Sequence, residues 1–337
     1  MDLHRRNYYK KKKKYLIVVM FLIMIIAALM YIGLSYGKTI YSFSHIYNVL
    51  FHGETEGAFV ITTLRLPRVI IGLLAGICFG LAGNIFQKLL RNPLASPDML
   101  GISTGASVAA VFAILILQLS GLIVSLIAII FGMLISLLIV LLSYHHGYSN
   151  NRLILIGIGM RAMLSAMISW MLIRTSEYDV GNALRWLSGS LNTVNINDAF
   201  SLLIVTIIAC VLIAIMNNGL SVMGLGEELP VSLGVNTKTL RISLVIVGLM
   251  LVAFATSITG PIASVSFLSG PIAGRILRNG KNNMAATACI GAILVLASDL
   301  IAQYGLSSRY PVGVVTGMLG APYLLYLIFM MNKKGVQ

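Results

Sequence analysis

Apolar residues run along most of the chain in long blocks, and short polar connections separate one block from the next. A membrane-spanning helix needs about 20 mainly apolar residues. Ten segments fit that pattern, at about 15–35, 60–89, 97–117, 120–143, 152–173, 199–216, 240–258, 262–278, 285–303 and 311–331. The pattern predicts an all-α polytopic membrane protein with one transmembrane domain over 15–331, a basic tail at 1–14 and a short tail at 332–337.

The composition supports a membrane protein and argues against a soluble one. Of the 337 residues, 58% are hydrophobic and 10% are charged, whereas a soluble domain is about half apolar and a quarter charged. The net charge of +14 does not indicate nucleic-acid binding, because the basic residues gather in the N-terminal tail and in short connections. We therefore expect the lipid bilayer, and no nucleic acid, as the surroundings of the chain.

The distribution of basic residues predicts the orientation in the membrane. An even number of spans places both termini on one side. With the N-terminus inside, 17 of the 24 lysines and arginines fall inside and six fall outside, while Arg161 lies within the fifth span. This excess follows the positive-inside rule and predicts that both tails are cytoplasmic.

Three connections are long enough to carry structure of their own. Those at 36–59 and 174–198 lie outside, and the aromatic residues of 36–59 predict that it lies along the membrane surface. The third, at 217–239, lies inside. NPLAS (92–96) follows the second span and GPIAS (260–264) follows the seventh, on opposite faces, which indicates an inverted internal repeat of the kind found in transporters.

Small residues recur in the second span, but groups that could carry chemistry do not gather anywhere. Gly72, Gly76 and Gly80 are spaced by four and predict a seam along which two helix backbones approach closely. The three cysteines stand apart in separate apolar runs, which gives neither a disulfide framework nor zinc spacing. We expect no catalytic residues, no metal site and no cofactor bound by this chain.

Four separated stretches stand out by their motifs: LRLPRVIIGLLAGICFGLAGNIFQKLLRNPLASPDMLGISTGA (64–106), GEELPVSLGVNTKTLR (226–241), GPIASVSFLSGPIAGRI (260–276) and YPVGVVTGMLGAPYLLYL (310–327). Together they resemble the membrane permease subunit of the iron–siderophore and vitamin B12 class of ABC importers, the FecCD-type permeases. The resemblance implies a multi-pass protein of the bacterial plasma or inner membrane. It also implies a second permease subunit, homologous or identical, two cytoplasmic ATPase subunits, and an extracellular or periplasmic substrate-binding protein.

The function that the resemblance implies is uptake of a ferric siderophore, with ATP hydrolysed in the partner subunits. Vitamin B12 or haem import by the same machine is the first alternative. An ion-coupled secondary transporter is the second, and it would need buried acidic residues. Asp299, near the outer end of the ninth span, is the acidic residue that the spans place inside the membrane.

Two arginines in LRLPR (64–68) are candidates for docking the binding protein. Arginines at the outer mouth of the family pair with glutamates of that protein, and Arg65 and Arg68 match the motif. Pro67 suits the first turn of a helix, and the rigid fork of arginine suits a bidentate carboxylate. Anchoring in the membrane interface is the alternative. Where vitamin B12 members have a further arginine this chain has Gln303, and Arg309 is predicted to replace it.

The inner connection 217–239 resembles the family's coupling segment, in which a short helix packs into a cleft on the ATPase. A solvated loop is the alternative. The residues predicted to couple to the ATPase are Glu227, Glu228, Leu229, Ser232, Leu233, Gly234 and Val235.

Arg161 lies nine residues into the fifth span, near the bilayer centre. An arginine there costs about 2.5–3.5 kcal/mol on insertion scales, so its side chain should face the protein interior or the pathway. We predict that Arg161 lines the translocation pathway together with Asn84 and Gln87 and helps an anionic ferric complex to pass. The alternative is an arginine bound to backbone carbonyls or to Asn84 or Gln87.

Overall fold

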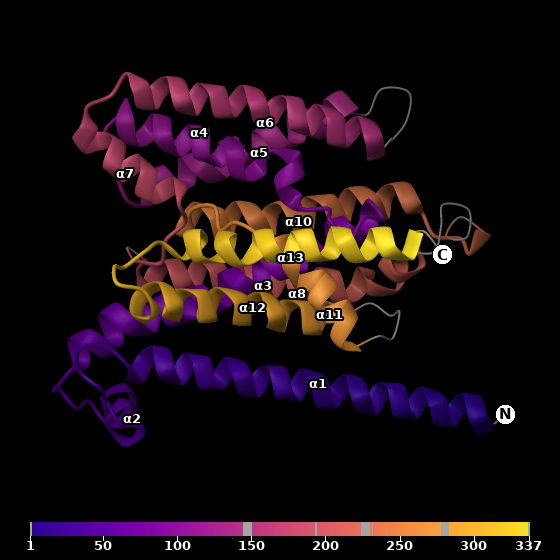
Figure 1. Cartoon of the computed structure of the whole chain (residues 1–337), viewed down its shortest axis with the longest axis horizontal. Helices are drawn as coiled ribbons and strands as arrows, with labels where there is room; N and C mark the ends of the chain where they lie inside the picture. Colours follow the sequence, from indigo (N-terminus) through magenta and orange to yellow (C-terminus); the bar gives the residue numbers. More distant parts are fainter. Residues whose placement is uncertain are drawn as a thin grey trace.

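A computed structural model describes residues 2–143, 150–192, 194–223, 230, 232–277 and 283–335, and every regular element within them is helical (Figure 1). The elements are α1 (Asp2–Ser35), α2 (Phe43–Phe51), η1 (Phe59–Arg65), α3 (Leu66–Leu89), η2 (Pro97–Leu100), α4 (Ile102–Leu115), α5 (Leu122–Ser143), α6 (Asn150–Ile173), α7 (Glu177–Leu187), α8 (Ile196–Met223), α10 (Thr237–Thr259), α11 (Val265–Leu277), α12 (Met284–Leu300), η3 (Ile301–Gly305) and α13 (Val312–Gly335).

Eight helices in the described part of the chain are long and apolar enough to cross a membrane. The third and eighth predicted spans are shorter helices, α4 with 14 residues and α11 with 13. Gly101, directly before α4, has φ 67° and Ser264, directly before α11, has φ 72°. A residue in the left-handed region cannot continue an α-helix, so the ranges 97–117 and 262–278 overestimated these two helices.

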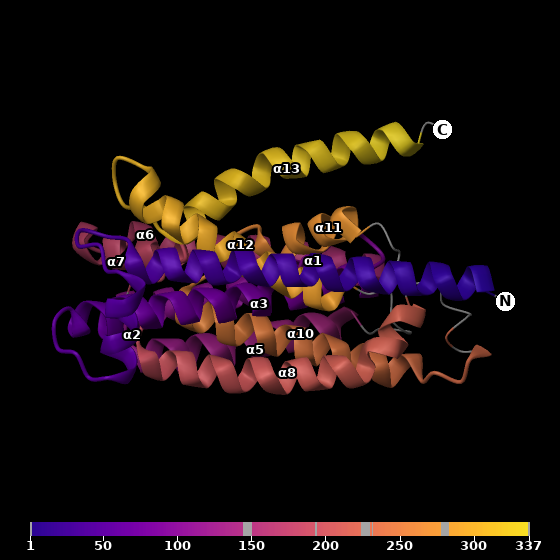
Figure 2. The same cartoon turned by 90° about the horizontal axis from the view of Figure 1, so that it is seen from below.

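The long helices run along one axis, and both chain ends lie at the same end of the bundle (Figure 1), as the positive-inside pattern predicts. Figure 2 shows the same alignment after a quarter turn. We call this the inner end and the opposite one the outer end. The two long outer connections each contain a short helix, α2 and α7, and α2 buries Ile46 and Val49.

Helix α3 is the most buried of the candidate spans and packs against α8, α10, α11 and α12. The predicted glycine seam permits its contact with α12. A Cβ atom on Gly76 would lie 2.5 Å from the carbonyl oxygen of Gly291 and 2.6 Å from Cα of Ala292. A Cβ atom on Gly80 would lie 2.7 Å from the carbonyl oxygen of Thr287. The seam is therefore confirmed at Gly76 and Gly80, because side chains there would force two backbones apart, whereas a Cβ atom on Gly72 would meet the side chains of Leu191 and Leu296.

The packing supports the predicted inverted repeat. Helix α3, the second span, packs on α11 and α12, the eighth and ninth, while α10, the seventh, packs on α4 and α5, the third and fourth. In each half of the chain, the third and fourth spans thus pack against the second span of the other half. The residues after α3 lie at the inner end, whereas Thr259 at the end of α10 accepts a hydrogen bond from Ser190 N of the outer connection at 2.7 Å.

Candidate functional site

Arg68 and Asp299 form a bidentate ion pair at the outer end. Arg68 Nε donates to Asp299 Oδ2 at 2.8 Å, and Arg68 Nη2 donates to Asp299 Oδ1 at 2.7 Å. The side chains are 16% and 7% exposed. Arg68 Nη1 also donates to Asn192 Oδ1 at 2.6 Å, and Gln303 Nε2 donates to Asp299 Oδ2 at 2.7 Å. We call Arg68, Asn192, Asp299 and Gln303 the outer cluster.

Three segments from distant parts of the chain build the outer cluster. Arg68 lies in the first turn of α3, directly after Pro67, and Asp299 lies in the last turn of α12. The close packing of α3 on α12 along the glycine seam brings these two turns together. A buried charge is stable only when it is paired and hydrogen-bonded. The cluster meets that condition, and it ties α3, α12 and the connection after α7 to one another.

Arg65 binds the end of the first helix. Its Nη1 donates to the carbonyl oxygens of Leu34 at 2.7 Å and Ser35 at 2.9 Å, and its Nη2 donates to that of Thr39 at 2.8 Å. The guanidinium carbon lies 5.1 Å from the centre of the Tyr41 ring. The last four carbonyl groups of a helix lack partners within it, so Arg65 acts as a cap for α1.

Arg309 differs from the other two predicted docking arginines because its side chain is exposed. It lies in the connection between η3 and α13, and Tyr310 N donates to Ala302 O at 3.2 Å, which folds this connection back onto η3. Gln303, which stands where the resemblance led us to look for an arginine, is engaged with Asp299. Docking by Arg65, Arg68 and Arg309 stays a prediction, and the structure adds internal partners for the first two.

Asn84 and Gln87 are buried where α3 meets α11 and α12. Asn84 Nδ2 donates to Thr287 Oγ1 at 2.7 Å, and Gln87 Nε2 donates to Phe267 O at 3.0 Å. Gly270 accommodates Gln87, because a Cβ atom there would lie 1.9 Å from Gln87 Oε1. A pathway role for both residues stays a prediction.

Arg161 is not brought together with these two amides. Its side chain is exposed on α6, a helix that packs on α4, α5 and η2. Asn84 and Gln87 are buried and hydrogen-bonded elsewhere, so Arg161 is not bound to either of these amides, and binding to backbone carbonyls is the part of the alternative interpretation that is left. The pathway role of Arg161 stays a prediction.

The inner segment between α8 and α10 is described at Pro230 and from Ser232 onward. Glu227, Glu228 and Leu229 lie outside the described residues. Val235 N donates to Pro230 O at 2.9 Å, and Gly234 has φ 75°. In this turn Leu233 is 65% exposed. Ser232 and Gly234 are also exposed, and Val235 is half-buried. The segment thus presents an apolar side chain at the inner end, where a partner would bind, and its coupling role stays a prediction.

Comparison with known proteins gives a family match along almost all of the transmembrane region. The model of the FecCD transport family matches residues 22–330. The chain belongs to the FecCD transport family. Ferric enterobactin transport system permease protein FepG of Escherichia coli (strain K12) is 35% identical over 276 residues, which are 82% of this chain and 84% of the relative. Vitamin B12 import system permease protein BtuC of Klebsiella pneumoniae subsp. pneumoniae is 30% identical over 287 residues, 84% of this chain and 86% of the relative.

A solved structure shares the fold of this FecCD permease. It is described as an inward-facing conformation of a metal-chelate type ABC transporter, and it matches with a TM-score of 0.80 and 25% identity over 94% of this chain and 99% of the other. The chain is therefore a multi-pass membrane permease subunit of an ABC transporter. Such subunits are not enzymes themselves, and they work with ATPase and substrate-binding partners.

The outer cluster is the feature of this FecCD permease that the sequence did not reveal. Its signal was present, however. The predicted topology put Arg68 and Asp299 at the same outer depth, and opposite charges at one depth in a membrane are expected to pair. Among the described residues, no three His, Cys, Asp or Glu side chains lie close enough together to bind a metal ion.

Proposed function

We propose that this FecCD permease forms part of the pathway by which an ABC importer takes up a ferric siderophore. An external binding protein delivers the complex, a second permease subunit completes the pathway, and two ATPase subunits drive it from the inner side. The observation that carries the proposal is the 35% identity with a ferric enterobactin permease along 82% of this chain. The match to the FecCD family model, over residues 22–330, includes nearly all of the predicted membrane-spanning region.

Arg161 supports a pathway on the α6 side of the chain. The residue is exposed in the isolated chain, near the middle of a candidate span that runs from Arg152 to Ile173. Contact with lipid there would cost about 2.5–3.5 kcal/mol. The face of α6 that carries Arg161 is therefore expected to meet the second permease or water, and a cation there favours an anionic ferric complex.

Leu233 supports coupling to an ATPase at the inner end. It is 65% exposed at the tip of a hydrogen-bonded turn, and an exposed apolar side chain suits a hydrophobic cleft on a partner. The turn is fixed on the α10 side by Asn236, whose side chain accepts a hydrogen bond from Thr239 N at 3.1 Å. Movement of the ATPase would reach α10 directly.

Two other functions remain as alternatives. Vitamin B12 import has one specific observation in its favour, the 30% identity with a vitamin B12 permease. An ion-coupled carrier needs a carboxylate that can bind and release a cation within the membrane. Asp299 was the candidate for that role, and its two oxygens are already bound by Arg68 and Gln303.

Uptake by cells distinguishes these functions. A strain lacking the chain is complemented with the full-length protein and supplied in turn with radioactive iron on catecholate, hydroxamate and citrate carriers, and with labelled vitamin B12. We expect restored uptake of at least one ferric complex and no effect on vitamin B12. Restoration of vitamin B12 uptake alone would overturn the siderophore proposal in favour of the alternative.

A further inference from the structure

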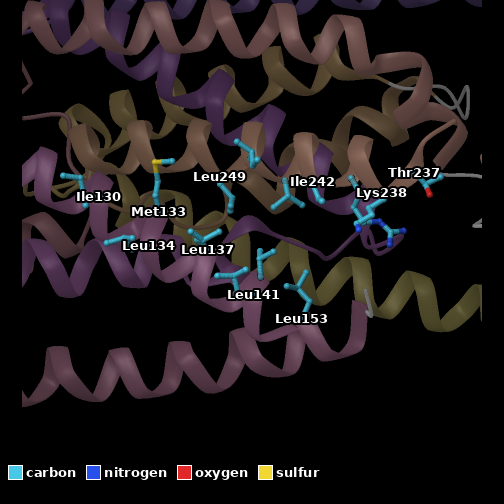
Figure 3. Close-up of a pocket in the computed structure, with 14 residues that line it drawn as sticks. Ile130, Met133, Leu134, Leu137, Leu141, Leu153, Thr237, Lys238, Ile242 and Leu249 are labelled. Atoms are coloured by element: carbon cyan, nitrogen blue, oxygen red, sulfur yellow. The ribbon is translucent and has the colours of Figure 1, made fainter. Parts of the chain in front are cut away.

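A groove of about 1010 Å³ runs between α5 and α10 on the inner half of the protein (Figure 3). None of the residues predicted for docking, for the pathway or for coupling lines it, although Thr237 and Lys238 lie at the end of the inner connection 217–239. Most of its wall is aliphatic. The lining residues are Ile130, Met133, Leu134, Leu137, Val140, Leu141, Leu153, Thr237, Lys238, Arg241, Ile242, Val245, Ile246 and Leu249.

The length of the groove matches one leaflet of a bilayer. On α10 the lining runs from Thr237 to Leu249, and on α5 it runs from Leu141 back to Ile130. Each stretch covers about 17 Å at the rise of an α-helix, which is about half of the ~30 Å hydrocarbon core. Both helices are candidate membrane spans. The groove therefore reaches from the inner membrane surface to the region of the midplane.

The charges of the groove lie at one end. Lys238 and Arg241 line the inner end, where Figure 3 shows Lys238 beside Thr237, and the other lining residues that the structure describes are uncharged. Lys238 is exposed and Arg241 is half-buried. Anionic lipids are enriched in the cytoplasmic leaflet, and basic pockets between spans on that side bind their head groups.

We propose that this groove binds one anionic phospholipid from the inner leaflet. The phosphate lies between Lys238 and Arg241, and an acyl chain lies along the aliphatic wall toward Ile130 and Leu249. An amphiphile with a negative head group matches both the charge at the inner end and the apolar length beyond it. The inference goes beyond the proposed function and does not depend on which substrate is carried.

The site is also next to the predicted coupling segment. Thr237 and Lys238 begin α10 directly after the turn that exposes Leu233. A bound head group would therefore hold the first turn of α10 at the membrane surface. The same helix packs on α3, α4, α5 and α8, so a lipid that holds α10 would also affect the position of α10 against these helices.

Native mass spectrometry of the purified full-length chain tests the proposal, with added phosphatidylglycerol or phosphatidylcholine as the probe. We expect one retained phosphatidylglycerol and about tenfold weaker retention of phosphatidylcholine, because two basic residues favour the anionic head group. The double variant Lys238→Gln with Arg241→Gln should lose this preference. The matched control, Lys13→Gln with Lys14→Gln, removes two exposed charges from the inner end of α1 and should keep it.

A second pair of variants tests the acyl-chain part of the site. Leu137 is 51% exposed and lines the groove, whereas Leu138 is 41% exposed and does not. Leu137→Trp should reduce phosphatidylglycerol retention severalfold, and Leu138→Trp should leave it unchanged. Equal retention of the two lipids by the wild type would overturn the proposal. So would equal retention of phosphatidylglycerol by the wild type, by the double variant at Lys238 and Arg241, and by Leu137→Trp. So would a lipid-free groove covered by a second copy of the chain.

Discussion

Arg68 and Asp299 are 231 residues apart in the sequence and are joined by two hydrogen bonds of 2.8 and 2.7 Å at the outer end of the bundle. The pair connects the first turn of α3 with the last turn of α12. The arginine that the family motif marks for docking thus also has a structural task within its own chain.

Removing either member of the pair should destabilise the protein. Arg68→Gln leaves a carboxylate that is 7% exposed without its cation, and Asp299→Asn leaves the cation without its carboxylate. Breaking a buried pair in this way costs about 3–5 kcal/mol. Thermal unfolding in detergent measures the loss, and the double variant should be less destabilised than the sum of the two single variants. Additive effects would contradict a direct interaction. Arg185→Gln, at an exposed outer arginine, serves as the control.

Docking of the binding protein should depend on Arg309 without any change in stability. Its side chain is exposed, so Arg309→Gln should lower the affinity and the association rate, most strongly at low salt. Arg65→Gln should instead lower the melting temperature, because it uncaps α1. Binding measured by surface plasmon resonance at equal amounts of folded protein separates the two effects. An unchanged affinity for Arg309→Gln would remove Arg309 from the docking surface.

The sequence predicted the spans well because long apolar runs report directly on the bilayer. It overestimated the lengths of α4 and α11, because the left-handed backbone conformations of Gly101 and Ser264 do not interrupt the hydrophobic pattern. Ser264 is the harder of the two to predict, because serine rarely adopts this conformation. The motif also singled out Arg65 and Arg68, but the sequence did not show their partners within the chain. Arg65 binds carbonyl groups of α1, and a backbone partner has no residue identity that a sequence pattern could display.

The glycine seam between α3 and α12 should not tolerate an added methyl group. Gly76→Ala would press Cβ against the backbone of Gly291 and Ala292, and backbone atoms cannot turn aside as a side chain can. We expect a loss of about 3 kcal/mol or more, seen as a lower melting temperature or reduced membrane abundance. Gly274→Ala on α11 is the control, because no described atom outside its own stretch of helix lies within 4 Å of the new Cβ. Equal melting temperatures for the two variants would contradict the seam.

Uptake should depend on the charge of Arg161. Arg161→Gln is expected to reach the membrane in normal amounts, since the side chain is exposed in the isolated chain, and to reduce ferric uptake severalfold. Arg161→Lys keeps the cation and should retain most of the uptake. Uptake assayed at matched subunit abundance gives the answer, and normal transport by Arg161→Gln would end the pathway role.

Reconstitution into liposomes tests the central claim, that this chain is a passive gate which partner subunits load and drive. The full-length chain is compared alone and together with its second permease, ATPase and binding protein. Accumulation of the ferric complex is predicted only in the complete system and only while ATP is hydrolysed. Accumulation against a gradient by the chain alone would contradict the account.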